Sequence, residues 1–89
     1  MSYPQFLDAL QTQLDELVVT GSDDDLFAGG YLQGHVMLAA GQYELEGDER
    51  SVEVFKVRVN ESLSRAIAAG ELNPQDQRLV LDLWQQLSQ

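Results

Sequence analysis

The chain has 89 residues, 44% of them hydrophobic, and its 15 acidic residues outnumber the five basic ones, giving a formal net charge of −10. This composition predicts one globular domain spanning residues 1–89 and excludes a disordered chain. The lack of cysteine excludes disulfides and thiolate chemistry. The negative charge argues against binding to nucleic acid or to an anionic membrane, both of which require clustered Lys and Arg.

The sequence shows no signal for export or for membrane insertion. The N-terminus lacks a basic segment followed by an apolar core, so we expect no secretory signal peptide. No run reaches the roughly eighteen apolar residues of a membrane span, because polar side chains interrupt the richest stretch. We therefore expect a cytoplasmic protein with no membrane contact. Its charge is compatible with a basic partner or with solubility alone.

The first predicted helix covers residues 3–19. Pro4 fits its first turn, where no helix hydrogen bond is lost. Apolar residues then recur at helical spacing, namely Phe6, Leu7, Leu10, Leu14, Leu17 and Val18. Thr20 and Gly21 end this helix, and so short a connection predicts that the next helix is its antiparallel neighbour.

The second predicted helix, residues 23–46, is apolar on two opposite faces. Ser22 and Asp25 form a capping-box pattern at its start. One face holds Leu26, Phe27, Gly30, Gly34, Met37, Leu38, Gly41 and Leu45, and the other holds Leu32, Val36, Ala39, Ala40 and Tyr43. Such a helix is either central in the fold or has one face left for a partner. The periodicity leaves open which face the protein itself covers.

Three glycines, Gly30, Gly34 and Gly41, lie along the centre of the first face. A glycine inside a helix costs about 1 kcal/mol relative to alanine, so three on one line need a reason. We expect close packing of another helix of the bundle against them. The opposite strip is then the surplus surface, and we predict that Leu32, Val36 and Tyr43 form the face for a partner or a second copy.

The last two predicted helices cover residues 51–69 and 74–88. Residues 47–50 form the preceding break, and the valines that follow partly alternate, so a strand is the alternative for the start of the third helix. Asn73 and Pro74 begin the fourth helix as its cap and first residue. The chain therefore predicts an all-α fold, most simply a four-helix antiparallel bundle with short loops.

Two segments resemble a known family, namely SDDDLFAGGYLQGH at residues 22–35 and AIAAGELNPQDQRLVLDLW at residues 66–84. The chain resembles the YfcL family of small, uncharacterised bacterial proteins over nearly its whole length. This resemblance implies a cytoplasmic all-α domain and supplies no activity.

A polar rim on the second helix is the candidate ligand site. His35 is the only histidine, Tyr31 lies one turn before it, and Asp24 and Gln42 fall along the same edge. These groups suit hydrogen bonding or modest acid–base chemistry, while the alternative is a histidine that is simply hydrogen-bonded at the boundary of the core. No Ser or Cys nucleophile lies in a motif, so we predict no catalytic residue.

No metal or other cofactor is predicted. One histidine without cysteine does not make a typical zinc or iron site. The acidic runs do not follow the spacing of a calcium loop, because Phe27 and Ala28 stand where a ligand and a glycine belong. The glycines lack the preceding strand of a dinucleotide-binding loop.

The favoured function is a non-enzymatic protein–protein interaction module whose partner is an unidentified protein or a second copy. The alternative is a small-molecule binder or modest enzyme that uses the Tyr31 and His35 rim. A third possibility, mimicry of nucleic acid by the acidic surface, fits the charge but has no patterned spacing to support it.

Overall fold

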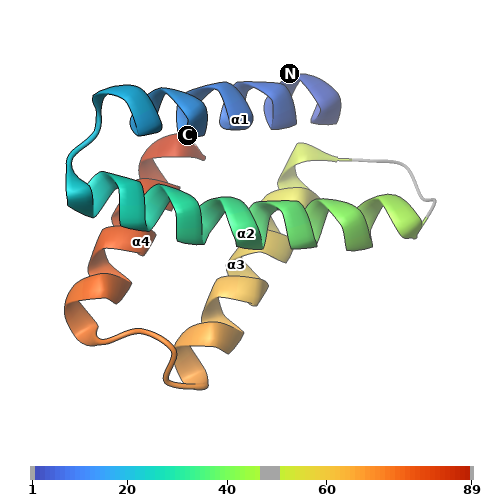
Figure 1. The fold of residues 1–89 in the computed structure, drawn as a ribbon. Helices are drawn as coiled ribbons and strands as arrows, with labels where there is room; N and C mark the ends of the chain where they lie inside the picture. Colours follow the sequence, from blue (N-terminus) through green and yellow to red (C-terminus); the bar gives the residue numbers. More distant parts are fainter. Residues whose placement is uncertain (1, 47–50, 89) are drawn as a thin grey trace.

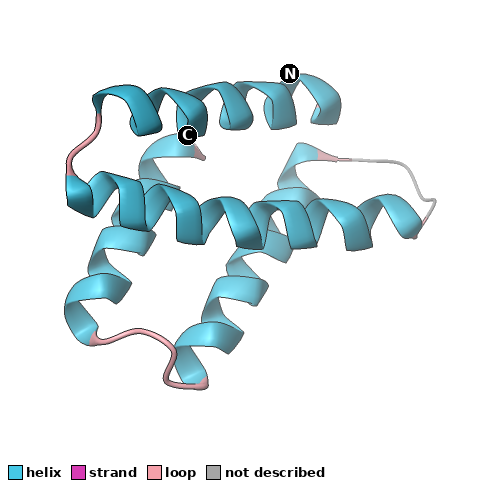
Figure 2. Ribbon diagram, viewed as in Figure 1, coloured by secondary structure: helices cyan, strands magenta, loops and turns pink. Residues whose placement is uncertain are grey.

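The computed structural model describes residues 2–46 and 51–88, and this part of the chain forms four helices. They are α1 (Tyr3–Thr20), α2 (Asp23–Leu45), α3 (Val52–Ala68) and α4 (Pro74–Leu87). Figure 2 shows helices and loops, with no strand among these residues. The all-α prediction is confirmed, and each helix end lies within one residue of the predicted one. The predicted break at 47–50 lies outside the described residues.

Each helix begins at a side chain that caps it. The capping residues Ser2, Ser22, Ser51 and Asn73 each accept a hydrogen bond from the backbone N–H three residues further on. At Ser22 the predicted capping box is present, since the Asp25 carboxylate accepts the N–H of Ser22 at 3.1 Å. These bonds satisfy N–H groups that have no partner inside the helix, and they fix where each helix starts.

Helix α2 is the centre of the arrangement. It runs antiparallel to α1, and α3 and α4 pass behind it at a steep angle (Figure 1). It packs against each of the other three helices, while α1 also packs against α3. The inner face of α2 is therefore covered from three directions.

The core surrounds this inner face. Leu32 and Val36 have no exposed surface, and Phe55 and Val59 of α3 are equally buried. At one end, the ring of Tyr3 meets those of Phe55 and Tyr43 edge-on, with centroids 5.1 and 5.4 Å apart. Trp84 is also buried and donates its indole N–H to Asn60 Oδ1 at 2.6 Å. One apolar core thus joins all four helices.

The face of α2 that we predicted for a partner is the face that the protein covers itself. Leu32 and Val36 are 0% exposed and Tyr43 is 3% exposed. Small residues between them, Ala39 and Ala40, are buried too and let the neighbouring helices come close. The prediction that Leu32, Val36 and Tyr43 form a partner or dimer face is therefore wrong, because these side chains make up the core.

The predicted close packing at three glycines is also wrong. A Cβ atom added at Gly30, Gly34 or Gly41 would meet no neighbouring atom within 4 Å, because all three lie on the side of α2 away from the core. The glycine in contact is Gly29, where an added Cβ would lie 3.4 Å from Leu17 Cδ1 of α1. The close approach between α1 and α2 occurs there.

An added charge should destabilise the protein strongly on the inner face of α2 and only slightly on its outer face. We expect Val36→Asp to lower the free energy of unfolding by about 3 kcal/mol or more, because it buries an unpaired carboxylate. The matched change Leu38→Asp, on a side chain that is 54% exposed, should alter it by about 0.5 kcal/mol or less. Urea denaturation followed by circular dichroism measures both. Equal stability of the two variants would contradict this assignment of faces.

Candidate functional site

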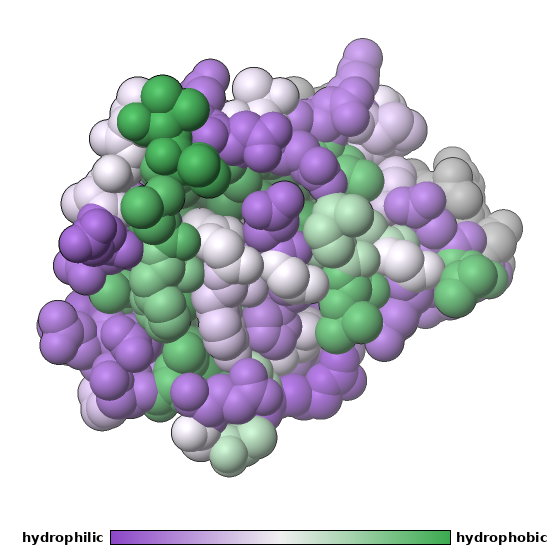
Figure 3. All heavy atoms as spheres, in the orientation of Figure 1, coloured by the Kyte–Doolittle hydropathy of each residue, from purple (hydrophilic) through white to green (hydrophobic). Residues whose placement is uncertain are grey.

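The outer face of α2 is an exposed apolar strip, which we call the outer strip. It consists of Leu26, Phe27, Gly30, Gly34, Met37, Leu38, Gly41 and Leu45. Its five large side chains are 40–88% exposed. In the space-filling view, hydrophobic side chains form separate groups along α2, and paler and hydrophilic side chains lie between these groups (Figure 3). The outer strip lies opposite the core and has no cover within the chain.

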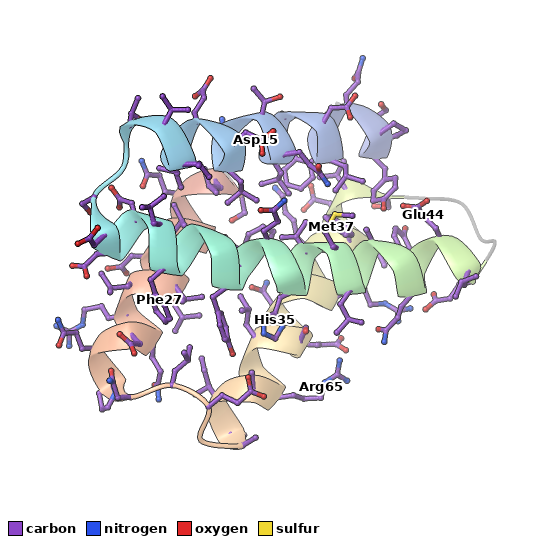
Figure 4. All side chains as sticks on the ribbon, in the orientation of Figure 1. Asp15, Phe27, His35, Met37, Glu44 and Arg65 are labelled. Carbon is purple, nitrogen blue, oxygen red and sulfur yellow. The ribbon has the colours of Figure 1, made fainter. Side chains whose placement is uncertain are left out.

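The three glycines form the floor of the outer strip. Phe27 projects to the side of α2 on which the loop between α3 and α4 lies, and Met37 projects to the side of α1 (Figure 4). Gln11 of α1 lies against Met37, with 2.8 Å between Nε2 and Sδ. A shallow hollow of about 330 Å³ is lined by Gly30, Tyr31, Gly34, His35 and Leu38. The outer strip is thus a groove with backbone at its base and larger side chains along its margins.

Aromatic rings follow one margin of this groove at helical spacing. The ring centroids of Phe27 and Tyr31 are 6.2 Å apart, and those of Tyr31 and His35 are 4.8 Å apart. Two hydrogen bonds hold this margin in place. His35 Nδ1 lies 2.6 Å from the buried Oγ of Ser62 in α3, and the Tyr31 hydroxyl donates to Glu71 Oε1 at 2.8 Å. These contacts tie α2 to α3 and to the loop before α4.

The predicted polar rim is assembled only in part. Tyr31 and His35 lie together in the hollow, whereas Asp24 and Gln42 are exposed and are not among its lining residues. Partial burial, followed by the hydrogen bond to Glu71 and its negative charge, raises the pKa of Tyr31 to about 12. At neutral pH Tyr31 is therefore protonated and donates to Glu71. The hollow therefore offers aromatic rings and hydrogen-bonding groups to a ligand. The Tyr31 hydroxyl does not act as a base at neutral pH, because it remains protonated.

Acidic side chains stand at both ends of the outer strip. Asp23, Asp24 and Asp25 are exposed in the first turn of α2, and Glu44 and Glu46 are exposed at its end. Among the described residues, the salt bridge in this region joins Glu46 Oε1 to Arg58 Nη2 at 2.6 Å. None of the three aspartates pairs with a described basic group. Because Glu46 is paired, the carboxylates without a described basic partner are the three aspartates at one end of the groove and Glu44 at the other.

Residues 2–46 and 51–88 hold no group of three His, Cys, Asp or Glu side chains placed to share a metal ion. None of their helices has the length and apolar character needed to cross a lipid bilayer.

Sequence reasoning grouped the outer strip correctly but assigned it to internal packing. Two features of the sequence indicate that this face is exposed. Its glycines weaken the helix, and three aspartates stand next to it, a combination that is unusual for a buried face. Two residues of the site were missed altogether, Ser62 and Glu71. They lie 27 and 40 positions along the chain from their partners His35 and Tyr31, so no local pattern connects them.

Comparisons with known proteins give one consistent family. The model of the YfcL protein family matches residues 4–89. The chain is 45% identical over 85 residues to "Uncharacterized protein YfcL" of Escherichia coli (strain K12), which covers 96% of this chain and 91% of that protein. No solved structure matches the chain.

The hydrogen bond from Tyr31 to Glu71 has a measurable consequence. In an NMR titration of tyrosine Cζ, we expect Tyr31 to ionise near pH 12, above the value of about 10 for an exposed tyrosine. Glu71→Gln should lower this pKa yet leave it above about 10, because partial burial, the largest cause, remains. Since the folded pKa is the higher one, the stabilisation is complete below about pH 10 and is lost toward pH 12. Ionisation of Tyr31 near pH 10 would contradict the contact.

The open glycines predict stabilising substitutions. Gly34→Ala and Gly41→Ala should each raise the free energy of unfolding by up to about 1 kcal/mol, since alanine favours the helix and the new methyl group meets no neighbour. Gly21→Ala is the contrasting variant, because its Cβ would lie 2.5 Å from the Leu17 carbonyl oxygen; it should lower stability. Urea denaturation distinguishes them. Destabilisation by Gly34→Ala would show that the floor is covered.

Proposed function

This chain belongs to the YfcL family, and we propose that it is a non-enzymatic interaction module of the cytoplasm that binds another protein through the outer strip. The observation that carries the proposal is the exposure of five large apolar side chains along a single face of the central helix. Large apolar side chains gathered on one exposed face of a monomer typically mark a binding surface, whereas apolar residues scattered singly do not.

The charge favours a basic protein over a second copy as the partner. Each copy carries a formal charge of −10, so two copies repel one another before they make contact. If two outer strips packed antiparallel, residues 23–25 of one copy would lie beside Glu44 of the other. A parallel pairing would place the aspartates of both copies together. Lys or Arg at the matching positions of another protein turns this repulsion into attraction.

The hollow beside Tyr31 and His35 supports a second candidate function, a small-molecule binder or modest enzyme. Its two rings offer stacking, and the described residues give His35 a hydrogen bond at Nδ1 to Ser62. It is a shallow part of the longer groove, and its walls otherwise consist of Gly30, Gly34 and Leu38. A large partner that covers the whole outer strip uses more of the exposed surface, so we favour the interaction module.

The test is binding that depends on the outer strip. Affinity capture from lysate of the source cells should retain a basic protein that the purified chain then binds directly. We expect Leu38→Asp to weaken this binding at least tenfold, because it places a carboxylate in an apolar contact. Val57→Asp is the matched control, since Val57 is 52% exposed on α3 and lies opposite its buried residues; it should change the affinity by less than about twofold. Isothermal titration calorimetry measures each.

Two results would contradict the proposed function. One is a set of captured proteins whose direct binding is the same for wild type and Leu38→Asp. The other is dimerisation of the wild-type chain through the outer strip, seen as a concentration-dependent mass in sedimentation that Leu38→Asp abolishes.

A further inference from the structure

The floor of the outer strip admits the backbone of another molecule. No neighbouring atom lies within 4 Å of the Cβ positions of Gly30, Gly34 and Gly41. By helical spacing, Leu26 and Met37 stand on one margin of this floor, and Phe27, Leu38 and Leu45 stand on the other. All five of these side chains are at least 40% exposed. The surface is therefore a lengthwise groove, and apolar side chains of a partner can pack between its margins.

The hydrogen bonding of α2 decides which kind of backbone fits this groove. The backbone N–H and C=O groups of the outer strip are already paired within the helix, so they cannot extend a partner strand as a sheet edge would. An extended segment laid along the groove would lose hydrogen bonds to water without replacement. A helix satisfies its own backbone groups and presents an apolar stripe. The outer strip extends from Leu26 to Leu45, about 30 Å at about 1.5 Å per residue, and accommodates several turns of a helix.

The ends of the groove specify the charge of that helix. Asp23, Asp24 and Asp25 lie at one end without a described basic partner, and Glu44 stands at the other with the Tyr3 hydroxyl donating to it at 2.9 Å. A helix with Lys or Arg beside its apolar stripe is attracted at both ends. A copy of α2 has an apolar face of similar size but carries acidic residues at the same ends. This charge complementarity separates a foreign helix from a second copy.

We infer that the outer strip recognises a basic amphipathic α-helix of another protein, packed with its apolar stripe over Gly30, Gly34 and Gly41. This inference rests on the proposed function and adds the chemistry of the recognised segment. The mode is that of a helix in a groove, with anchors spaced at i, i+3, i+4 and i+7.

The experiment uses the full chain and three synthetic peptides of equal length. The first has leucine at helical spacing on one face and lysine on the other. The second has the same composition in an order that gives no apolar face, and the third has glutamate in place of lysine. We expect the first peptide to bind at least tenfold more tightly than either control in a ¹⁵N NMR titration. Its binding should shift the amide signals of Gly30, Gly34 and Gly41.

Two variants at one position locate the peptide on the floor. Gly34→Gln fills the groove with an uncharged polar side chain and should weaken the binding of the first peptide at least tenfold. Gly34→Ala adds only a methyl group and should weaken it less. Both variants keep the net charge, and circular dichroism confirms that α2 stays helical. A Gly34→Gln variant that binds as tightly as wild type overturns the inference.

The remaining outcomes are equally decisive. Equal affinity for the first and second peptides means that charge alone attracts lysine, and the inference fails. If the first peptide does not bind while binding of the captured protein still depends on Leu38, the recognised segment is not a basic helix and the proposed function stands. If neither the binding of the first peptide nor that of the captured protein depends on Leu38, both the inference and the proposed function are wrong.

Discussion

Burial of the inner face of α2 is the interaction on which the rest of the structure depends. Leu32 and Val36 are wholly buried, and each such side chain contributes about 1.5–3 kcal/mol by leaving water. Because α2 packs against all three other helices, its buried face joins α1, α3 and α4 in one core. Loss of this burial would therefore disturb every helix pair in which α2 takes part.

This central burial also determines which surface remains free. A helix enclosed by three neighbours on one side has its opposite side directed to solvent, and in α2 that opposite side is apolar too. Polar contacts outside the core fix its margin, because His35 and Tyr31 are held by Ser62 and Glu71. Side chains that are already held lose less conformational freedom when a partner binds. The margin beside the groove is therefore preorganised by the same helices that build the core.

Local chemistry made the helices predictable, whereas the choice between the two faces of α2 was not. Ser22 with Asp25 and Asn73 with Pro74 are signals within three residues, and the structure confirms both caps. Both apolar faces have the same period, so periodicity could not rank them. Glycine was interpreted as a sign of close packing, but Gly34 has open space. The inner face is instead marked by alanines, which favour a helix and occupy little room. Contacts such as Tyr31 with Glu71 join distant positions and leave no local pattern.

The outer strip is costly for the isolated chain in two ways. Its three glycines weaken the helix by up to about 1 kcal/mol each, and no contact in the described structure offsets that loss. Its large apolar side chains remain in water and favour association. Net charge opposes indiscriminate association, because two copies at −10 repel one another at any orientation of their strips. The aspartates that begin α2 therefore act twice. They stabilise the positive end of the helix dipole, and in the proposed function they reserve the apolar groove for a surface of opposite charge.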